Sequence, residues 1–169
     1  MAFQASSHAE FPLPPSPSPD SLPNRSVLAG YDFAEEIPGI EDYRRLREVS
    51  GLSPKSDEAA RIALPNTLFA VVVRHDGRAV GMGRVVGDGG CHMQIVDMAV
   101  EPAHQGKGIG KAIFAALEAW LTRTVPDTAY VSLIADGDAK HLYAKFGFEE
   151  VMPASIGMAR FFRGDPAKR

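Results

Sequence analysis

The sequence contains a single cysteine, Cys91, among its 169 residues. An internal disulfide and a cysteine-based metal framework each need at least two cysteines, so both are excluded. A lone thiol is typical of a reducing intracellular compartment, and we therefore expect a cytoplasmic protein in which Cys91 is a small buried hydrophobe. The opening stretch MAFQASSHAE agrees with that expectation, because it lacks the basic and apolar regions of a signal peptide.

Long apolar runs and excess positive charge are also missing. No run approaches the roughly 18 apolar residues of a membrane span. Lys and Arg number 18 against 21 Asp and Glu, which gives a net charge of −3. Nucleic acids and anionic membranes favour basic surfaces, so we expect neither as a partner. The histidines have no metal-ligand spacing, and we expect no metal.

Proline is concentrated at one end of the chain. Residues 1–26 hold six of the thirteen prolines and six serines. Proline removes a backbone donor, and this stretch has too few large apolar groups to offset the entropy of ordering. We predict a disordered or polyproline-like tail over 1–26 and one domain over 27–169, with a ligand for a proline-binding module as the alternative for the tail.

Hydrophobic periodicity predicts alternating helices and strands in the domain. The expected strands are 27–37, the two arms of a hairpin over 67–86, 91–102, 128–135 and 156–162. The expected helices are 38–51, 53–64, 109–124 and 138–148. Asp76-Gly77 predicts the hairpin turn. Ile109, Ile113, Leu117 and Leu121, with Phe114 beside them, predict the buried face of the longest helix.

The strand over 91–102 changes phase along its length. Its apolar residues lie at odd positions up to Ile95 and at even positions from Val96 onward. A strand alternates its faces with period 2, so this flip between 95 and 96 predicts a β-bulge.

The segment PAHQGKGIG, residues 102–110, joins that strand to the longest helix. A helix start offers unpaired N–H groups and the positive end of a dipole. Glycines let an anion approach the backbone, while Lys107, Lys111 and Gln105 add charge and a donor. The turn therefore predicts a phosphate or pyrophosphate site. A tight turn that binds nothing is the alternative.

Three phosphate motifs match this turn poorly. A P-loop needs Ser or Thr after Gly110-Lys111, where the chain has Ala112. The dinucleotide fingerprint G-x-G-x-x-G is one residue short. An RNA-binding GXXG clamp matches in letters, but the chain is acidic and has no basic stripe.

The segment VDMAVEPAHQGKGIGKAIFAALEAWL closely resembles the GNAT superfamily of acetyl-coenzyme A-dependent N-acetyltransferases. The family pattern is a bulged strand followed by [QR]-x-x-G-x-[GA], here Gln105 to Gly110. HLYAKFGFEE is similar to the second family pattern, a tyrosine four residues before Gly-Phe. The resemblance covers roughly residues 28–163. It implies an α/β (α+β) GNAT fold with a mixed sheet of about six to seven strands, about four helices and a bulged fourth strand.

The resemblance also implies acetyl-CoA as co-substrate and a set of residues that bind it. Backbone amides would hold the pyrophosphate, and they belong to Gln105, Gly106, Lys107, Gly108, Ile109, Gly110 and Lys111. The bulged strand at Met98, Ala99 and Val100 would pair with the pantetheine arm. An N–H of Met98 or Ala99 would stabilise the thioester oxygen as it becomes negative.

Tyr143 matches the general acid of the family, although its place in an apolar helical stripe also fits a core role. Asp97 is the first candidate for the base, and His92, Glu36 and Glu101 are weaker candidates. Asp136 stands where family members often have asparagine.

The implied reaction is direct acetyl transfer to a primary amine in a ternary complex. We expect a small-molecule acceptor, and the pI near 5.9 favours a cationic amine such as an arylalkylamine, polyamine or amino sugar. We expect the acceptor between 39–64 and the far strands, near Tyr31, Phe33, Tyr43, Phe161 and Phe162. An inactive acyl-CoA-binding module, a protein or peptide acetyltransferase and a homodimer remain open.

Overall fold

A five-stranded mixed sheet is the middle layer of the computed structural model, which describes residues 28–160. The strands follow chain order across the sheet. They are β1 Asp32–Ala34, β2 Phe69–His75, β3 Arg78–Gly87, β4 His92–Val100 and β5 Tyr130–Leu133. The first four are antiparallel neighbours, and β5 is parallel to β4.

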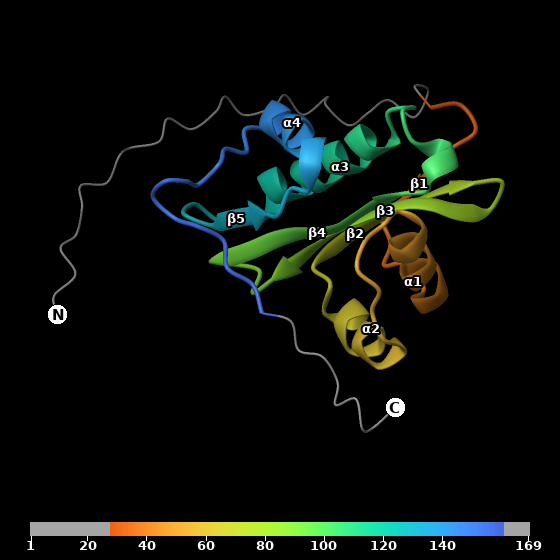
Figure 1. The fold of residues 1–169 in the computed structure, drawn as a ribbon, viewed down its shortest axis with the longest axis horizontal. Helices are drawn as coiled ribbons and strands as arrows, with labels where there is room; N and C mark the ends of the chain where they lie inside the picture. Colours follow the sequence, from red (N-terminus) through yellow and green to blue (C-terminus); the bar gives the residue numbers. More distant parts are fainter. Residues whose placement is uncertain (1–27, 161–169) are drawn as a thin grey trace, which may run out of the picture.

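Helices cover both faces of this sheet (Figure 1). On one face lie α1 Ile40–Val49 and α2 Asp57–Ala63, and on the other lie α3 Ile109–Thr124 and α4 Lys140–Tyr143. Short 3-10 turns occupy Leu64–Asn66, Pro102–His104, Gly137–Ala139 and Ala144–Phe146. Within residues 28–160, no helix has both the length and the apolar character that a membrane crossing requires.

The sheet separates two apolar cores, because alternate residues of each strand point to opposite faces. On β2, Val71 and Val73 belong to the core under α3, and Val72 belongs to the core under α1. The predicted face of α3 is confirmed, since its five members are 3% exposed or less: Ile109, Ile113, Phe114, Leu117 and Leu121. Each such side chain stabilises the fold by about 1.5–3 kcal/mol relative to an exposed position.

The hairpin turn lies where the sequence predicts it, and local residues also define the two ends of α2. The hairpin turn between β2 and β3 has φ of 50° at Asp76 and 77° at Gly77, the positive pair that a type I′ turn requires. The side chain of Ser56 caps α2 by accepting a hydrogen bond from the Ala59 N–H at 3.1 Å. Pro65 follows α2 in a 3-10 turn.

The bulge in β4 is present, but two residues later than the sequence pattern indicates. Arg84 pairs with Val96 and Met82 with Ala99, so Asp97 and Met98 together oppose the single residue Gly83. Asp97 has φ of 57°, which shifts the alternation of the strand. Gly83 leaves room for this shift, because a Cβ there would lie 2.7 Å from the Met98 sulfur.

Other expectations at the sheet edges and in one loop were wrong or fall outside the described residues. Residues 28–160 contain five strands rather than six to seven, and 156–160 form no strand. The first strand has three residues. Cys91 is exposed, because it lies in the loop before β4. The expected tail over 1–26 and Phe161 and Phe162 lie outside the described residues.

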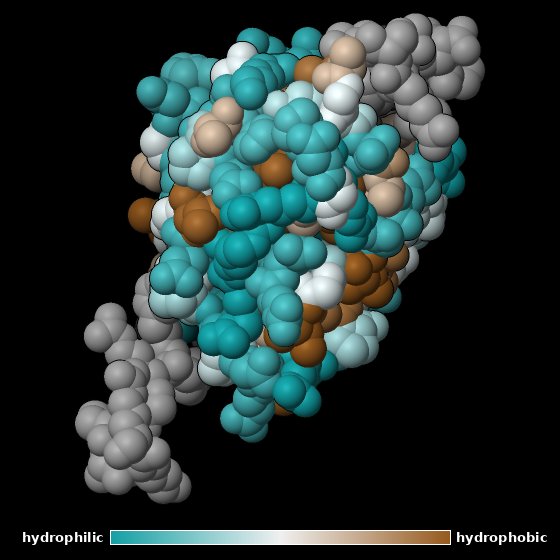
Figure 2. Space-filling view, turned by 90° about the vertical axis from the view of Figure 1, so that its right-hand side faces the viewer, coloured by the Kyte–Doolittle hydropathy of each residue, from teal (hydrophilic) through white to brown (hydrophobic). Residues whose placement is uncertain are grey.

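The surface at the hairpin end of the molecule, on the right in Figure 1, is mostly hydrophilic (Figure 2). Hydrophobic residues on that side form small groups between polar ones. Several exposed large hydrophobic side chains lie instead in the segment after α4, namely Val151, Met152, Ile156 and Met158.

Candidate active site

The glycine turn, residues 105–110, leads from the 3-10 turn Pro102–His104 into α3. Gly106 has φ of 74°, and Gly108, the residue that precedes α3, has φ of 88°. L side chains rarely adopt these values, so glycine is required there by conformation. A Cβ on either residue would have no neighbour within 4 Å, so both face open space.

The turn presents a run of backbone N–H groups without acceptors. The first hydrogen bond of α3 runs from the Ala112 N–H to the Gly108 carbonyl at 3.0 Å. Among the described residues, the N–H groups from Gly106 to Lys111 have no acceptor. Free donors at a helix start, with open space before them and two exposed lysines nearby, fit the pyrophosphate of coenzyme A.

Gln105 connects the glycine turn to β4 and does not belong to the run of unpaired backbone N–H groups. Its backbone N–H donates to the Pro102 carbonyl at 3.2 Å. Its side-chain Nε2 donates to the Val100 carbonyl at 2.9 Å. The backbone N–H and one side-chain N–H of this predicted binding residue are therefore engaged inside the protein, and the run of free amides begins at Gly106.

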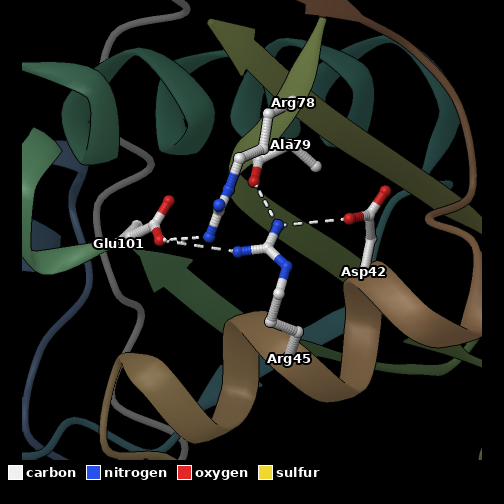
Figure 3. Close-up of polar contacts among 5 residues, drawn as sticks. All are labelled: Asp42, Arg45, Arg78, Ala79 and Glu101. Atoms are coloured by element: carbon white, nitrogen blue, oxygen red, sulfur yellow. Dashed lines mark hydrogen bonds and ion pairs between the residues drawn. The ribbon is translucent and has the colours of Figure 1, made fainter.

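Glu101 fixes the approach to the turn through two arginines (Figure 3). Its Oε1 accepts a hydrogen bond from Arg78 Nη2 at 2.8 Å and lies 3.6 Å from Arg45 Nη1. Arg45 reaches up from α1, and its Nη2 also donates to Asp42 and to the Ala79 carbonyl. This network joins α1, β3 and the end of β4, and it occupies a residue that the sequence offers as a weaker base.

An open strand edge lies between the bulge and the turn. β4 and β5 pair from His92 opposite Tyr130 to Ile95 opposite Leu133. Beyond that point, residues 96–100 have no strand partner on the β5 side within the described chain, although the Val100 carbonyl accepts from the Gln105 side chain and β3 still pairs with β4, Met82 opposite Ala99. Met98, Ala99 and Val100 thus lie on an edge that an extended ligand can join.

Tyr143 lies at the end of α4 and is 8% exposed. Its ring centroid is 4.9 Å from that of Phe114 in the core under α3. Burial raises the pKa of the phenol above its ordinary value of 10.0, and the nearby carboxylate of Asp136 raises it further. The hydroxyl therefore keeps its proton at neutral pH, as a general acid must.

Asp97, the first candidate for the base, lies in an ion-pair cluster on the other face of the sheet. Its Oδ1 accepts a hydrogen bond from Arg47 on α1, and its Oδ2 lies 3.2 Å from Arg84 Nη1 on β3. Its side chain is 8% exposed. A base role for Asp97 needs one of these pairs to open. Among the weaker candidates, Glu36 pairs with Arg74, and the exposed His92 has edge contact with Tyr130.

A cavity of about 660 Å³ opens beside this cluster, between α1, α2, β3 and β4. We call it the acceptor cavity, after the role that we propose for it below. Tyr43 lines it and lies between the two arginines, with its ring centroid 5.7 Å from Arg47 Cζ and 5.3 Å from Arg84 Cζ. Burial and the carboxylate of Asp97 raise the pKa of Tyr43 above 10.0, so its hydroxyl stays protonated at neutral pH.

Two of the aromatic residues expected at the acceptor lie elsewhere. The Tyr31 hydroxyl lies 2.9 Å from His104 Nδ1 and accepts a 3.3 Å hydrogen bond from Lys107, beside the glycine turn. Phe33 packs against the core under α3. Sequence reasoning missed Arg47 and Arg84, and the only signal for the latter is a charge inside the apolar strand AVGMGRVV.

Comparisons with known proteins agree with this arrangement. The profile described as "Acetyltransferase (GNAT) domain" matches residues 66–150. The crystal structure of a probable acetyltransferase from methicillin-resistant Staphylococcus aureus is 44% identical in sequence. It covers 78% of this chain and 99% of its own, with a TM-score of 0.75.

Two curated relatives match smaller shares of their own lengths. A histone acetyltransferase from Glycine max is 35% identical over 72 residues, which are 43% of this chain and 30% of that protein. Mycothiol acetyltransferase from Clavibacter michiganensis is 32% identical over 92% of this chain and 51% of its own length. The chain thus spans about half or less of these two curated relatives. The profile match over half of the chain and the staphylococcal structure show that the chain belongs to the GNAT acetyltransferase family.

Proposed function

We propose that this chain transfers the acetyl group of acetyl-CoA to a primary amine of a small molecule, by direct attack in a ternary complex. The observation that carries the proposal is the run of unpaired N–H groups from Gly106 to Lys111 at the start of α3. The open edge of β4 and the acceptor cavity support it, because they provide places for an extended thioester arm and for a second substrate.

Each part of the site has one task in this proposal. The amides from Gly106 to Lys111 bind the diphosphate, and Lys107 and Lys111 add positive charge at its rim. The edge of β4 at Met98, Ala99 and Val100 hydrogen-bonds the pantetheine arm, and an N–H of Met98 or Ala99 stabilises negative charge on the acyl oxygen. Acetyl-CoA supplies an activated acetyl thioester when it is bound.

Tyr143 holds a proton on its Oη for the departing sulfur. A thiolate is already a good leaving group, since a free thiol has a pKa of about 8.5. The acid therefore contributes about 100-fold, at the low end of what positioned acids achieve. The amine must reach the thioester uncharged, and Asp97, acting through water, remains our candidate to accept its proton.

The test is thiol release from acetyl-CoA with a panel of small amines and lysine-containing peptides, alongside calorimetric titration of coenzyme A. Peptides belong in the panel because one relative is named a histone acetyltransferase. We expect coenzyme A to bind and small amines to be acetylated. Binding without turnover of any amine would indicate an inactive acyl-CoA-binding module, and turnover of peptides alone would indicate a protein acetyltransferase.

A further inference from the structure

The acceptor cavity carries more positive than negative charge. Among the residues that the structure describes, the cations that line it are Arg47, Lys55 and Arg84, and the one carboxylate is that of Asp97. A polyamine or another multiply charged cation would meet net repulsion there. The overall charge of −3 therefore describes the rest of the surface and not this cavity.

Arg84 is the residue that most needs a further partner. It is 2% exposed, and its Nε is buried without an acceptor among the described residues, while its Nη1 lies 3.2 Å from Asp97 Oδ2 as an ion pair that lacks hydrogen-bond geometry. Its one ion pair is with Asp97, which also binds Arg47. A buried guanidinium with unpaired donors is costly, because it gives up hydration without replacing it.

Arg84, with its missing hydrogen-bond acceptor, lies close to the proposed reaction site. Arg84 lies opposite Val96 in the sheet, next to the bulge at Asp97 and Met98. A ligand group at Arg84 would therefore lie beside the stretch of β4 that we assign to the thioester. The cavity volume of about 660 Å³ suits a small molecule with one such group.

We propose that the acceptor is an amine that also carries an acidic group, a carboxylate or a phosphate, which binds Arg84 and Arg47 in the acceptor cavity. This inference rests on the proposed acetyl transfer and narrows its substrate class. Guanidinium groups bind planar and tetrahedral oxyanions through paired hydrogen bonds. The exposed Lys55 at the cavity adds attraction for the incoming anion.

Matched pairs of amines test the inference with the wild-type protein. Lysine is compared with cadaverine, tyrosine with tyramine, and phosphoethanolamine with ethanolamine, by thiol release from acetyl-CoA. We expect kcat/KM to be about 10- to 100-fold higher for the acidic member, the range of a hydrogen bond to a charged group. The first two pairs report on a carboxylate and the third on a phosphate.

The outcomes separate the inference from the function on which it rests. Turnover of the non-acidic members at equal or higher kcat/KM would refute the inference and leave acetyl transfer standing. If no amine is turned over, the proposed function fails. Calorimetric titration of lysine and cadaverine into the coenzyme A complex then decides whether the cavity selects an acid, and equal or tighter binding of cadaverine refutes the inference.

Variants assign the effect to the cavity. Arg84→Gln should raise KM for the acidic acceptor about 10- to 100-fold and change KM for its non-acidic partner far less. Arg61→Gln is the control, because Arg61 is 69% exposed on α2 and does not line the cavity. Equal losses for both acceptors in Arg84→Gln would contradict the assignment.

Arg84→Gln leaves Asp97 with one partner, so its fold is checked by the fluorescence of Trp120, the single tryptophan. If that variant does not fold, Lys55→Gln replaces it. We expect a several-fold smaller preference for the acidic acceptor in Lys55→Gln, and a preference that weakens further as salt is added. An unchanged preference at all salt concentrations would count against the proposal.

Discussion

At the scale of single residues, the Tyr143 ring packs in the core, and its hydroxyl has a raised pKa and so stays protonated. Its ring fills part of the core beside Phe114, and the same burial raises the pKa of its hydroxyl. A tyrosine that only filled space would tolerate loss of the hydroxyl. The two roles can therefore be separated by removing one oxygen atom.

We expect Tyr143→Phe to bind coenzyme A as the wild type does and to lose about 100-fold in kcat, because the phenyl ring keeps the packing and only the acid is removed. Thiol-release kinetics and calorimetry measure the two effects. Tyr130→Phe is the control, since Tyr130 is 50% exposed on β5. An unchanged kcat in Tyr143→Phe would assign Tyr143 to the core alone.

Glu118 on α3 carries a carboxyl group whose pKa is raised above 4.5 by burial. Because the folded-state pKa of Glu118 is raised, its full contribution to the free energy of unfolding is present below the unfolded-state pKa. That contribution is lost as the pH rises through the folded-state pKa. The ionised group at neutral pH is thus a local weakness in α3.

Glu118→Gln should raise the free energy of unfolding at pH 7, and this gain should vanish near pH 4, where the native glutamate is also neutral. Urea unfolding followed by Trp120 fluorescence at both pH values measures the difference. Glu149→Gln, which changes an exposed glutamate after α4, is the control. A gain of equal size at both pH values would show that burial of the charge is not its cause.

At the scale of elements, the glycine turn brings two requirements together at Gly108. The residue has the positive φ with which the chain enters α3, and the open space before it is where we propose that the diphosphate binds. Elsewhere in the chain, Gly51 after α1 has φ of 83° and an equally open surrounding, but it is not part of the turn. Substitutions at Gly108 and Gly51 can therefore distinguish the effect of conformational strain from the effect of blocking a binding surface.

Gly108→Ala and Gly51→Ala should each lower the free energy of unfolding by about 1 kcal/mol, the typical cost of a left-handed conformation for an L residue. Only Gly108→Ala should also weaken coenzyme A binding, by about 10-fold or more, because its methyl group faces the diphosphate. Calorimetry gives the affinity and urea unfolding the stability. Equal affinities in the two variants would argue against the turn as the binding site.

Elements were predictable from the sequence where one local pattern decides the structure. The spacing from Ile109 to Leu121 gives the buried face of α3, and Asp76-Gly77 gives the hairpin turn. The bulge was predicted from its phase flip, but its position was not, because Gly83 on the neighbouring strand determines where Met98 can fit.

The acceptor cavity could not be predicted in the same way, because its charges come from separate elements. Arg47 on α1, Arg84 on β3 and Asp97 on β4 meet only in the folded chain. Apolar spacing alone would place Val49 on the same face of α1 as Tyr43 and Leu46, yet Val49 is 38% exposed and Arg47 is 7% exposed. Arg47 can be buried because it pairs with Asp97, which is distant in the sequence. Local periodicity carries no information about such a partner.

At the scale of the whole molecule, the sheet separates the two regions in which we propose that the ligands bind. The glycine turn belongs to the side of α3, and the acceptor cavity lies on the side of α1 and α2 (Figure 1). Within residues 28–160, β4 takes part in both regions, through its bulge and its open edge. Ligand binding on one side should therefore stabilise the complete fold.

Acetyl-CoA at 100 times its Kd should raise the free energy of unfolding by about 2.7 kcal/mol, because it binds only the folded chain. For a domain of this size we expect Tm to rise by several degrees. Thermal unfolding at increasing ligand concentration measures the shift. Pantetheine, which lacks the diphosphate, should shift Tm far less at equal concentration, and an equal shift would place the main binding energy outside the glycine turn.

The exposed loop thiol has a practical consequence for such experiments. Cys91 is the only cysteine and Trp120 the only tryptophan. A maleimide dye will thus attach at one site, and the indole provides a single native energy-transfer donor to it without any engineered mutation. The same thiol will add one fixed equivalent to every colorimetric sulfhydryl assay, so a Cys91→Ser background removes that offset and also prevents covalent pairing of molecules during storage.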